Sequence, residues 1–284
     1  MDELTTRQIQ RGDIVWIKTG EFRHFINEIF PHITAPFVLV VSVGDESFPS
    51  TYCGPEEFET ILSNENVIHI FAQNCDYEGK SNKISHIPIG IDYHTTAYFN
   101  PGQWKEFGSV AEQESRFQNV LTQLLPTPQR KKRAFIDFHL HDTARGSQTS
   151  IYGGDRTSIF RKLVSLEFID HATMEMPRTE LWKIKGQYAF SICPYGNGMD
   201  TCRIWEDMIL GCICIAKSIP AFTCLYEGLP VVLVQDWSEV TAENLDKWLL
   251  QYQDAFSNPA YREKLTNIYW INKIRHTAAQ FNQD

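Results

Sequence analysis

Short apolar segments alternate with amphipathic ones along the whole chain, and this alternation limits the possible folds more than any other feature. Residues 37–43, with the sequence FVLVVSV, are almost wholly apolar, which is typical of a strand covered on both faces of a parallel sheet. Amphipathic stretches of helical length separate the apolar segments, as crossover connections between parallel strands require. The sequence therefore predicts an α/β fold with parallel sheets.

The alternation gives one set of expected elements in each half of the chain. The expected strands cover residues 13–18, 37–43, 67–72, 84–89, 134–138, 167–170, 188–192, 212–216 and 231–234. The expected helices cover residues 21–30, 55–62, 110–125, 156–165, 178–185, 201–210, 221–226, 242–256 and 260–281. The sequence PTPQ at 126–129 interrupts the pattern. We therefore expect one Rossmann-like domain over 1–128 and a second over 129–258. A C-terminal helix within 259–284 would cross back to the first domain through Trp270, Ile271 and Ile274.

Composition excludes some classes of protein. The formal net charge of −9 argues against a general nucleic-acid binder, which needs a basic face. We interpret the basic run at 130–133 as a solvated linker rather than a localisation signal or polyanion site. No signal-peptide pattern opens the sequence, and no apolar run is long enough to span a bilayer. The seven cysteines form no compact disulfide pattern, which favours a reducing compartment, and Cys212 and Cys214 fit a buried strand.

The segment CPYGNGMDTCRIWE at 193–206 carries the most chemical information. Gly196 and Gly198 let the backbone approach a ligand closely, and Asp200 is placed to cap the following helix. A helix N-terminus is a favourable site for an anion such as phosphate. The glycine pattern lacks the third glycine of a dinucleotide-binding fingerprint.

Arg203 and Glu206 are three residues apart, so helical spacing projects them from one face. An arginine binds a diphosphate with paired donors, and a glutamate accepts from ribose hydroxyls, so a nucleoside diphosphate would use both. The alternative is a surface ion pair beside an ordinary turn.

The run SICPYGNGMDTCRIWEDMILGCICIAKSIPAFTCLYEGLPVVLVQDWSEVT at 191–241 resembles the donor-binding half of exostosin-like glycosyltransferases. It is most similar to small anchorless members from large algal viruses, some of them xylosyltransferases. FAQNCDY at 71–77 and IPIGIDYH at 87–94 look more loosely like the family's acceptor-side loops. The chain shows no long amino-terminal stem, so Golgi location and heparan-type substrates do not carry over.

This resemblance implies a GT-B fold, in which the parallel sheets of two Rossmann-like domains face a central cleft. Residues 1–128 would be the acceptor side and residues 129–258 the donor side. Arg203 and Glu206 would hold the donor's phosphate and ribose. The residues lining the donor pocket would be Tyr195, Gly196, Asn197 and Asp200.

Further donor-side candidates follow the first strand of the second half. Arg156 or Arg161 would supply positive charge to the diphosphate, and the alternative is that both are ordinary helix arginines. His139, which follows the same strand, is a further candidate for donor binding. With His141 it is also a weak candidate for a zinc site, because no third and fourth ligand follow at suitable spacing. The sequence has no strict Asp-X-Asp motif, which agrees with a metal-independent enzyme.

Transfer with inversion needs a general base from the first domain. Asp45, which follows the buried strand at 37–43, is the first choice, with an Asx-turn residue as the alternative. Asp92 is the second choice, and a retaining mechanism would need neither.

The predicted function is transfer of a sugar from a nucleotide-sugar donor to a carbohydrate hydroxyl of a glycan acceptor. The resemblance favours UDP-xylose, then other UDP-sugars, then GDP-fucose, with no cofactor besides the donor. Alternatives are a non-catalytic carbohydrate- or nucleotide-binding protein and a sugar-nucleotide epimerase or hydrolase. We expect no nucleic-acid partner and a cytoplasmic location, in the host cytoplasm if the chain is viral.

Overall fold

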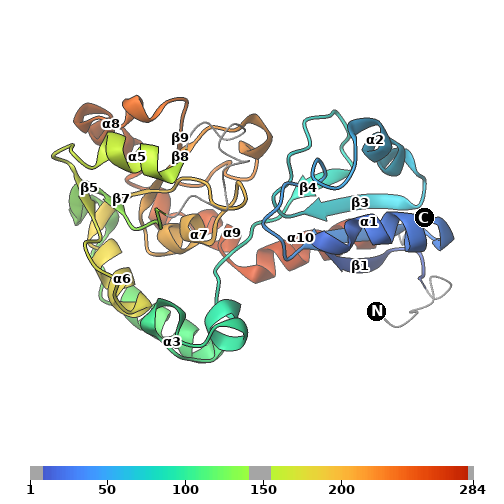
Figure 1. Ribbon diagram of the computed structural model, residues 1–284, viewed down its shortest axis with the longest axis horizontal. Coiled ribbons are helices and arrows are strands. Elements are labelled where there is room, and N and C mark those ends of the chain that lie inside the picture. Colours follow the sequence, from blue (N-terminus) through green and yellow to red (C-terminus); the bar gives the residue numbers. More distant parts are fainter. Residues whose placement is uncertain (1–8, 141–154, 281–284) are drawn as a thin grey trace.

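Two α/β units make up the computed structural model, which describes residues 9–140 and 155–280 (Figure 1). Each unit contains one sheet whose paired strands are all parallel. The first sheet has the order β1-β2-β3-β4, with β1 (Asp13–Lys18), β2 (Phe37–Ser42), β3 (Val67–Ala72) and β4 (Ile84–His86). The second has the order β6-β5-β7-β8-β9, with β5 (Lys131–Ile136), β6 (Ile169–His171), β7 (Tyr188–Ile192), β8 (Ile213–Lys217) and β9 (Val231–Val234). The predicted α/β class with two parallel sheets is confirmed.

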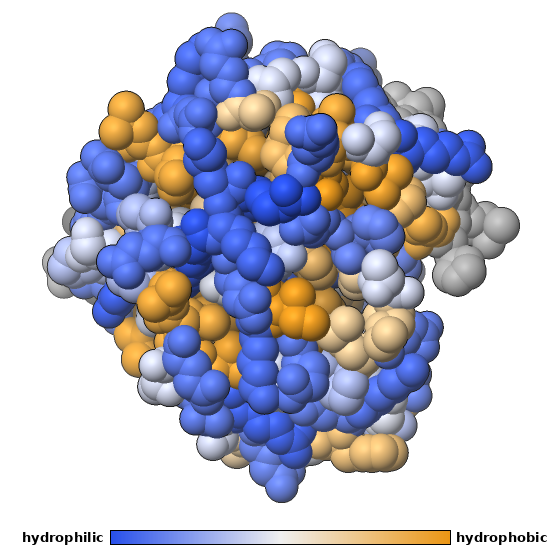
Figure 2. Space-filling view, turned by 90° about the vertical axis from the view of Figure 1, so that its left-hand side faces the viewer, coloured by the Kyte–Doolittle hydropathy of each residue, from blue (hydrophilic) through white to orange (hydrophobic). Residues whose placement is uncertain are grey.

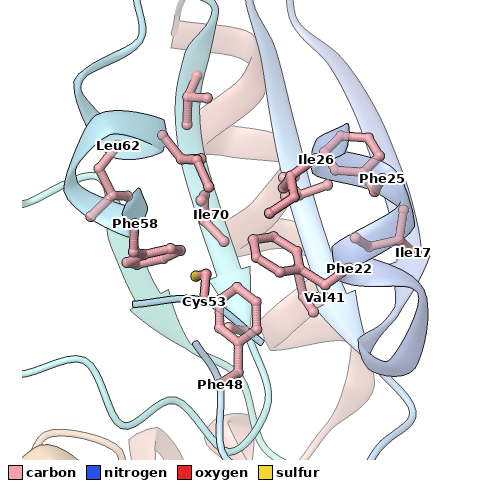
Figure 3. Close-up of a cluster of buried hydrophobic side chains, with 14 of the residues drawn as sticks. Ile17, Phe22, Phe25, Ile26, Val41, Phe48, Cys53, Phe58, Leu62 and Ile70 are labelled. Atoms are coloured by element: carbon pink, nitrogen blue, oxygen red, sulfur yellow. The ribbon is translucent and has the colours of Figure 1, made fainter. Parts of the chain in front are cut away.

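The apolar strand β2 is buried on both faces, as its sequence predicts. Leu39 and Val41 belong to the core between the sheet and helices α1 (Phe22–His24) and α2 (Pro55–Ser63). Figure 3 shows this core, with Phe22 and Phe58 packed over the strands. Val38 and Val40 point to the opposite face, where they join Ala278 of helix α10 (Asn267–Gln280). The period-two alternation of a strand thus divides β2 between two helical layers.

The helix expected over 21–30 is irregular. Only Phe22–His24 is α-helical, and a π-helical turn over Phe25–Ile29 follows it. Phe25 and Ile26 are both buried in that turn, although they are adjacent in the sequence. The need to bury both side chains is consistent with a local departure from the α-helical period.

The second sheet is covered by helices on both faces. These helices are α5 (Arg156–Leu163), α6 (Arg178–Lys185), α7 (Cys202–Ile209) and α8 (Ala242–Tyr252). α5 and α8 contribute Ile159 and Leu245 to one core, whereas α7 contributes Trp205 and Met208 to another. The outward face of this unit, on the left of Figure 1, is mainly hydrophilic with separate apolar patches (Figure 2).

The interpretation of residues 130–133 as a solvated linker is wrong, because residues 131–133 form the first half of β5. Arg133 binds the Asp170 carboxylate through two hydrogen bonds of 2.7 and 2.6 Å. Lys132 pairs with Asp246 of α8, and Arg130 donates to the carbonyl of Leu210 at the end of α7. These basic side chains therefore join neighbouring elements of the second unit.

Two helices pack on a different unit from the one to which the sequence division at residue 128 assigns them. Helix α3 (Val110–Leu121) packs on α6, with 4.5 Å between the ring centroids of Phe117 and Trp182. The contacts of α3 therefore lie with the second unit, although the expected boundary follows residue 128. After α9 (Pro259–Lys264), helix α10 returns to the first sheet, where it contacts β1, β2 and β3 (Figure 1).

Candidate functional site

The strand order of the second sheet marks one position for a ligand. β5 and β7 are neighbours, and the chain leaves β5 towards β6 but leaves β7 towards β8, in opposite directions along the sheet. In doubly wound sheets, ligands bind in the crevice outside the carboxyl ends of strands at such a switch point. Here the residues at that point are Asp137 and Phe138 after β5 and the loop 193–201 after β7. We call the loop 193–201 the β7 loop.

Arg156, the first residue of α5, is buried against the β7 loop. Its Nε donates a hydrogen bond of 2.8 Å to the carbonyl of Tyr195. A Cβ atom at Gly196 would lie 3.0 Å from the Arg156 guanidinium, so a glycine lets this side chain approach without displacement. Asp155 caps the helix by accepting from the amide of Ser158. The structure thus brings Arg156, Tyr195 and Gly196 together, as the sequence predicts.

The β7 loop also touches the first unit. The Nδ2 of Asn197 donates to Oδ2 of Asp45 over 3.0 Å. A Cβ atom at Gly198 would lie 2.3 Å from the carbonyl oxygen of Asp45, closer than real atoms approach. Gly198 is therefore required by the close contact between the two loops, rather than by a positive φ angle.

Backbone strain accompanies Asp45. Val43, two residues earlier, has a φ angle of 65°, which is a rare conformation for a β-branched residue. Gln73 holds this turn by accepting from the amide of Val43 and donating to the carbonyl of Gly44, at 3.1 and 3.0 Å. Such strain costs about 1–3 kcal/mol and clusters at functional sites. The side chain of Asp45 is exposed, so it is accessible to a substrate.

Asp92, the second candidate base, already has partners. Its Oδ1 accepts from the amide of Thr95 at 3.0 Å and lies 2.9 Å from Nδ1 of His94. Its backbone carbonyl accepts from Arg178 over 2.6 Å. The carboxylate is therefore mostly covered and oriented by its own loop.

Cys202, in the first turn of α7, is influenced by acidic groups of both units. Burial, followed by the charges of Glu206, Asp92, Asp200 and Asp45, raises the pKa of the Cys202 thiol to about 12. Asp45 and Asp92 come from the first half of the chain and act on this thiol through their charge. Asp45 contacts the β7 loop through Asn197, whereas Asp92 contacts the second unit through Arg178.

Arg203 and Glu206 lie three residues apart on α7 and bind different partners. Arg203 Nε donates to Asp137 over 2.6 Å. Glu206 pairs with Arg178 and accepts from Nε1 of Trp182 at 3.1 Å. The Arg203 and Glu206 side chains are both largely buried, so they do not form the surface ion pair that was the alternative.

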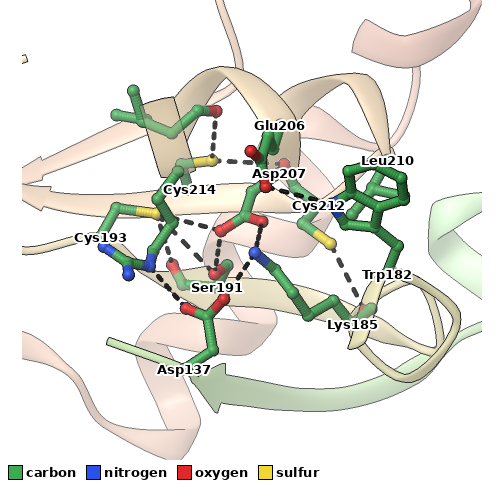
Figure 4. A network of polar contacts seen from close by, with 12 residues as sticks. Asp137, Trp182, Lys185, Ser191, Cys193, Glu206, Asp207, Leu210, Cys212 and Cys214 are labelled. Carbon is green, nitrogen blue, oxygen red and sulfur yellow. Dashed lines mark hydrogen bonds and ion pairs between the residues drawn. The ribbon is translucent and has the colours of Figure 1, made fainter. Parts of the chain in front are cut away.

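A buried charge network lies under the switch point (Figure 4). Lys185 pairs with Asp137 at 2.8 Å and with Asp207, which also accepts from Ser191. Burial opposes ionisation of Asp137, but Lys185 and Arg203 hold its pKa below its usual value. Burial raises the pKa of Asp207 to about 6, despite the nearby Lys185. Asp137 is therefore the ionised partner that fixes Arg203.

Asp200 does not cap α7. The N-cap residue is Thr201, and its side chain makes no capping hydrogen bond. The Asp200 carboxylate is fully buried and accepts instead from the Ile89 amide at 2.7 Å, from Trp205 Nε1 and from the Tyr226 hydroxyl. Burial raises its pKa to about 6, although these bonds oppose the shift. Asp200 thus joins the two units, and its oxygens are occupied by protein donors.

The remaining candidates lie at the edge of the site or beyond it. His139 follows β5 and is exposed, whereas His141 lies outside the described residues. Arg161 is exposed in the last turn of α5, at the other end of the helix from Arg156. Within 9–140 and 155–280, no group of three or more His, Cys, Asp or Glu side chains could hold a metal ion. In the same ranges, no helix is both long and apolar enough to cross a membrane.

The sequence analysis missed Arg178, Asp137, Lys185 and Asp207. Asp137 had a usable signal, because an acid directly after the apolar strand residues 134–136 stands at the carboxyl edge of the sheet. Arg178 and Lys185 look like ordinary ends of an amphipathic helix, and only the fold brings them to acids on α7 and β5.

A separate cleft of about 650 Å³ lies between the units, away from the β7 loop. It is lined by Cys75 after β3, His86 at the end of β4, Ala221 and Cys224 after β8, and Trp270 and Lys273 of α10. All seven cysteines lie in the described part of the chain and are free thiols.

No protein-family model and no curated protein matches the sequence. Among solved structures, an α1,3-fucosyltransferase is 13% identical, with a TM-score of 0.39. The match covers 100% of this chain and 93% of that chain. An E. coli structure named for trehalose-6-phosphate and bound with UDP-2-fluoro glucose matches with 13% identity, 98% and 74% coverage, and a TM-score of 0.42. The pneumococcal O-GlcNAc transferase GtfA, in complex with UDP and GlcNAc, matches with 14% identity, 98% and 57% coverage, and a TM-score of 0.35. This chain thus spans little more than half of the GtfA chain.

The architecture itself is that of two Rossmann-like units with parallel sheets, joined through a helix that returns to the first unit. It agrees with the GT-B fold that the sequence predicts.

Proposed function

We propose that this chain is a GT-B glycosyltransferase that moves a sugar from a nucleotide-sugar donor to a carbohydrate hydroxyl. The observation that carries the proposal is the convergence of Arg156, the β7 loop and the start of α7 at the switch point of the second sheet. Asp45 faces this point from the first unit. A donor bound there has its reacting carbon beside a carboxylate of the opposite unit.

The donor's diphosphate would bind at the β7 loop and the N-terminus of α7. Arg156 and Arg203 supply positive charge, and the exposed backbone amides of a helix start favour an anion. Asp137 and Lys185 hold Arg203 in place from below. A fixed cation stabilises the negative charge that develops on a leaving diphosphate, because it needs no reorganisation during the reaction.

Glu206 would accept from the ribose hydroxyls while it keeps its bonds to Arg178 and Trp182. A carboxylate offers about four acceptor positions, and these two donors use only part of them. Tyr195, Asn197, Asp200 and His139 complete the proposed surroundings of the donor. Asp200 acts there by holding the units together rather than by contact.

Asp45 is the proposed general base of an inverting reaction. Its carboxylate takes the proton of the acceptor hydroxyl, and that oxygen forms a bond to the anomeric carbon. The bond between the anomeric carbon and the phosphate oxygen breaks, and the nucleoside diphosphate leaves with the electron pair. Asp92 is the second choice, since His94 and Thr95 already hold its carboxylate.

Within this class, we propose an exostosin-like enzyme that uses UDP-xylose without a metal ion. The resemblance of residues 191–241 to that family, and to its anchorless viral members, supports the choice of sugar. Arginine and a helix N-terminus support a metal-independent diphosphate site.

The test is nucleotide release from a panel of UDP-, GDP- and CMP-sugars, with EDTA present and with mixed oligosaccharides as acceptors. Release from UDP-xylose that requires an acceptor and is lost in Arg156→Gln supports the full proposal. If nucleotide is released from another sugar nucleotide instead, that compound is the donor and UDP-xylose is not. If no nucleotide-sugar is used and calorimetry detects no nucleotide binding, the chain is not such a transferase, and a carbohydrate-binding role takes its place.

A further inference from the structure

Between β4 and α3, the chain carries aromatic side chains that the fold leaves uncovered. We call residues 93–107 the aromatic loop. The side chains of Tyr98, Phe99 and Phe107 are 72%, 76% and 68% exposed. The loop begins in the connection that runs between the two units in Figure 1. Three large aromatic rings exposed within ten residues are unusual on a protein surface and indicate a binding surface.

Direct contacts join the aromatic loop to the candidate site. The rings of His94 and Phe99 meet edge to face, with 5.5 Å between centroids. His94 binds Asp92, whose carbonyl accepts from Arg178. Arg178 in turn pairs with Glu206 on α7. The exposed rings therefore begin next to Asp92, the second candidate base, which Arg178 links to Glu206.

The loop is held in an unfavourable backbone conformation. Trp104 and Lys105 have φ angles of 54° and 52°, in the left-handed region that non-glycine residues rarely adopt. The Trp104 ring packs on the Arg178 guanidinium, 4.4 Å from its centroid. The Phe107 ring lies over Gly102, where an added Cβ atom would come within 3.2 Å of it. Such strain persists where surrounding contacts enforce it, and it is common at ligand clamps.

We propose that the aromatic loop binds the acceptor as a chain of sugar rings, which stack on Tyr98, Phe99 and Phe107. This inference rests on the proposed function. Polar groups lie among the rings: Asn100 directly follows Phe99, and Glu106, which precedes Phe107, is oriented by Thr179 at 2.9 Å. A saccharide needs both, because its CH faces pack on aromatic rings and its hydroxyls require hydrogen-bond partners. The terminal sugar would then reach Asp45 and Asp92, while the rest of the chain lies along the loop.

The proposal can be tested by calorimetry on the full chain with four probes, which are xylohexaose, cellohexaose, mannohexaose and chitohexaose. We expect at least one to bind. Tyr98→Ala with Phe99→Ala should weaken that binding by roughly tenfold or more, because two stacking contacts are lost. Leu250→Ala is the matched control, since Leu250 of α8 is 68% exposed and remote from the loop. Both changes are at the surface, so circular dichroism should show an intact fold.

Binding of UDP in the same variants separates this inference from the proposed function. Unchanged UDP binding with weakened hexasaccharide binding supports the inference. If no hexasaccharide binds, or if the Leu250 variant loses as much affinity as the aromatic variant, the inference is overturned while UDP binding keeps the proposed function. Self-association that disappears in the aromatic variant would also overturn it, because the rings would then be an interface between copies. Hexasaccharide binding without UDP binding would support saccharide binding by the aromatic loop and contradict the proposed glycosyltransferase activity.

Discussion

Asn197 of the second unit donates a hydrogen bond to the carboxylate of Asp45 in the first unit, with 3.0 Å between Nδ2 and Oδ2. The loop proposed to hold the donor thus touches the group proposed to act as base. Gly198 beside it allows the two backbones to approach. A donor bound at the β7 loop would therefore be coupled to the position of Asp45.

Asp45→Asn should abolish most of the transfer activity. The amide keeps the size of the side chain but cannot accept the proton of the acceptor hydroxyl, so kcat should fall by roughly 100- to 10,000-fold. Donor affinity should stay within about threefold, because the Asn197 contact is only partly lost. The measurement is kcat together with Kd for the nucleotide, beside Asp92→Asn. A normal kcat in Asp45→Asn and a large loss in Asp92→Asn would move the role of base to Asp92.

Arg156→Gln should weaken nucleotide binding by about tenfold or more, because a charge-assisted contact with the diphosphate is lost. Arg161→Gln is the matched control on the same helix, where the side chain is exposed and distant from Tyr195. Calorimetry with UDP gives both values. Equal effects of the two substitutions would show that only general positive charge matters, which contradicts the placement of the diphosphate.

Arg178→Met should destabilise the fold strongly, because Glu206 would be left buried without its cation. Breaking such a pair costs about 3–5 kcal/mol of unfolding free energy. Adding Glu206→Gln should restore part of this loss. Urea denaturation measures the unfolding free energy of each variant.

The exposed pair Arg23–Glu57 provides the control for that measurement, since Arg23→Met should cost no more than about 1 kcal/mol. If Arg178→Met costs as little as Arg23→Met, the Arg178–Glu206 pair does not contribute as the structure indicates.

Asp200→Asn should change the pH dependence of stability. In the folded chain the pKa of Asp200 is raised from 3.8 to about 6, so the folded state favours the protonated form. The stabilisation from this proton is complete below pH about 4 and is lost as the pH rises through about 6. Relative to Asp200→Asn, the unfolding free energy of the unmodified chain should therefore fall across this window. The slope is at most about 1.4 kcal/mol per pH unit.

Asp207 has its pKa raised to about 6 in the same way and contributes its own slope, so the variant should keep part of the pH dependence. Urea denaturation at several pH values between 4 and 7 measures the difference between the two proteins. A constant difference would show that Asp200 keeps an ordinary pKa in the folded chain.

The strands and most of the helices follow from local patterns. β2 is predictable because FVLVVSV has no polar residue before Ser42, and a strand buried on both faces requires this. The glycines at 196 and 198 predict a close approach at this loop, and the groups that approach them in the structure are Arg156 and Asp45.

Contacts between distant residues could not be predicted in the same way. Helical spacing places Arg203 and Glu206 near each other, but their buried partners, Asp137 and Arg178, are 66 and 28 residues away. The apolar face of α3 shows that Phe117 must be buried, but not that Trp182 of the second unit covers it. The aromatic loop was missed because exposed rings have no periodicity.

The most direct test of the account is a crystal structure of the chain with UDP bound. The account predicts that the diphosphate lies at the carboxyl ends of β5 and β7, within hydrogen-bond distance of Arg156 and the β7 loop, with Glu206 facing the ribose. UDP in the cleft beside His86 and Trp270 instead, with the β7 loop unchanged, would contradict it.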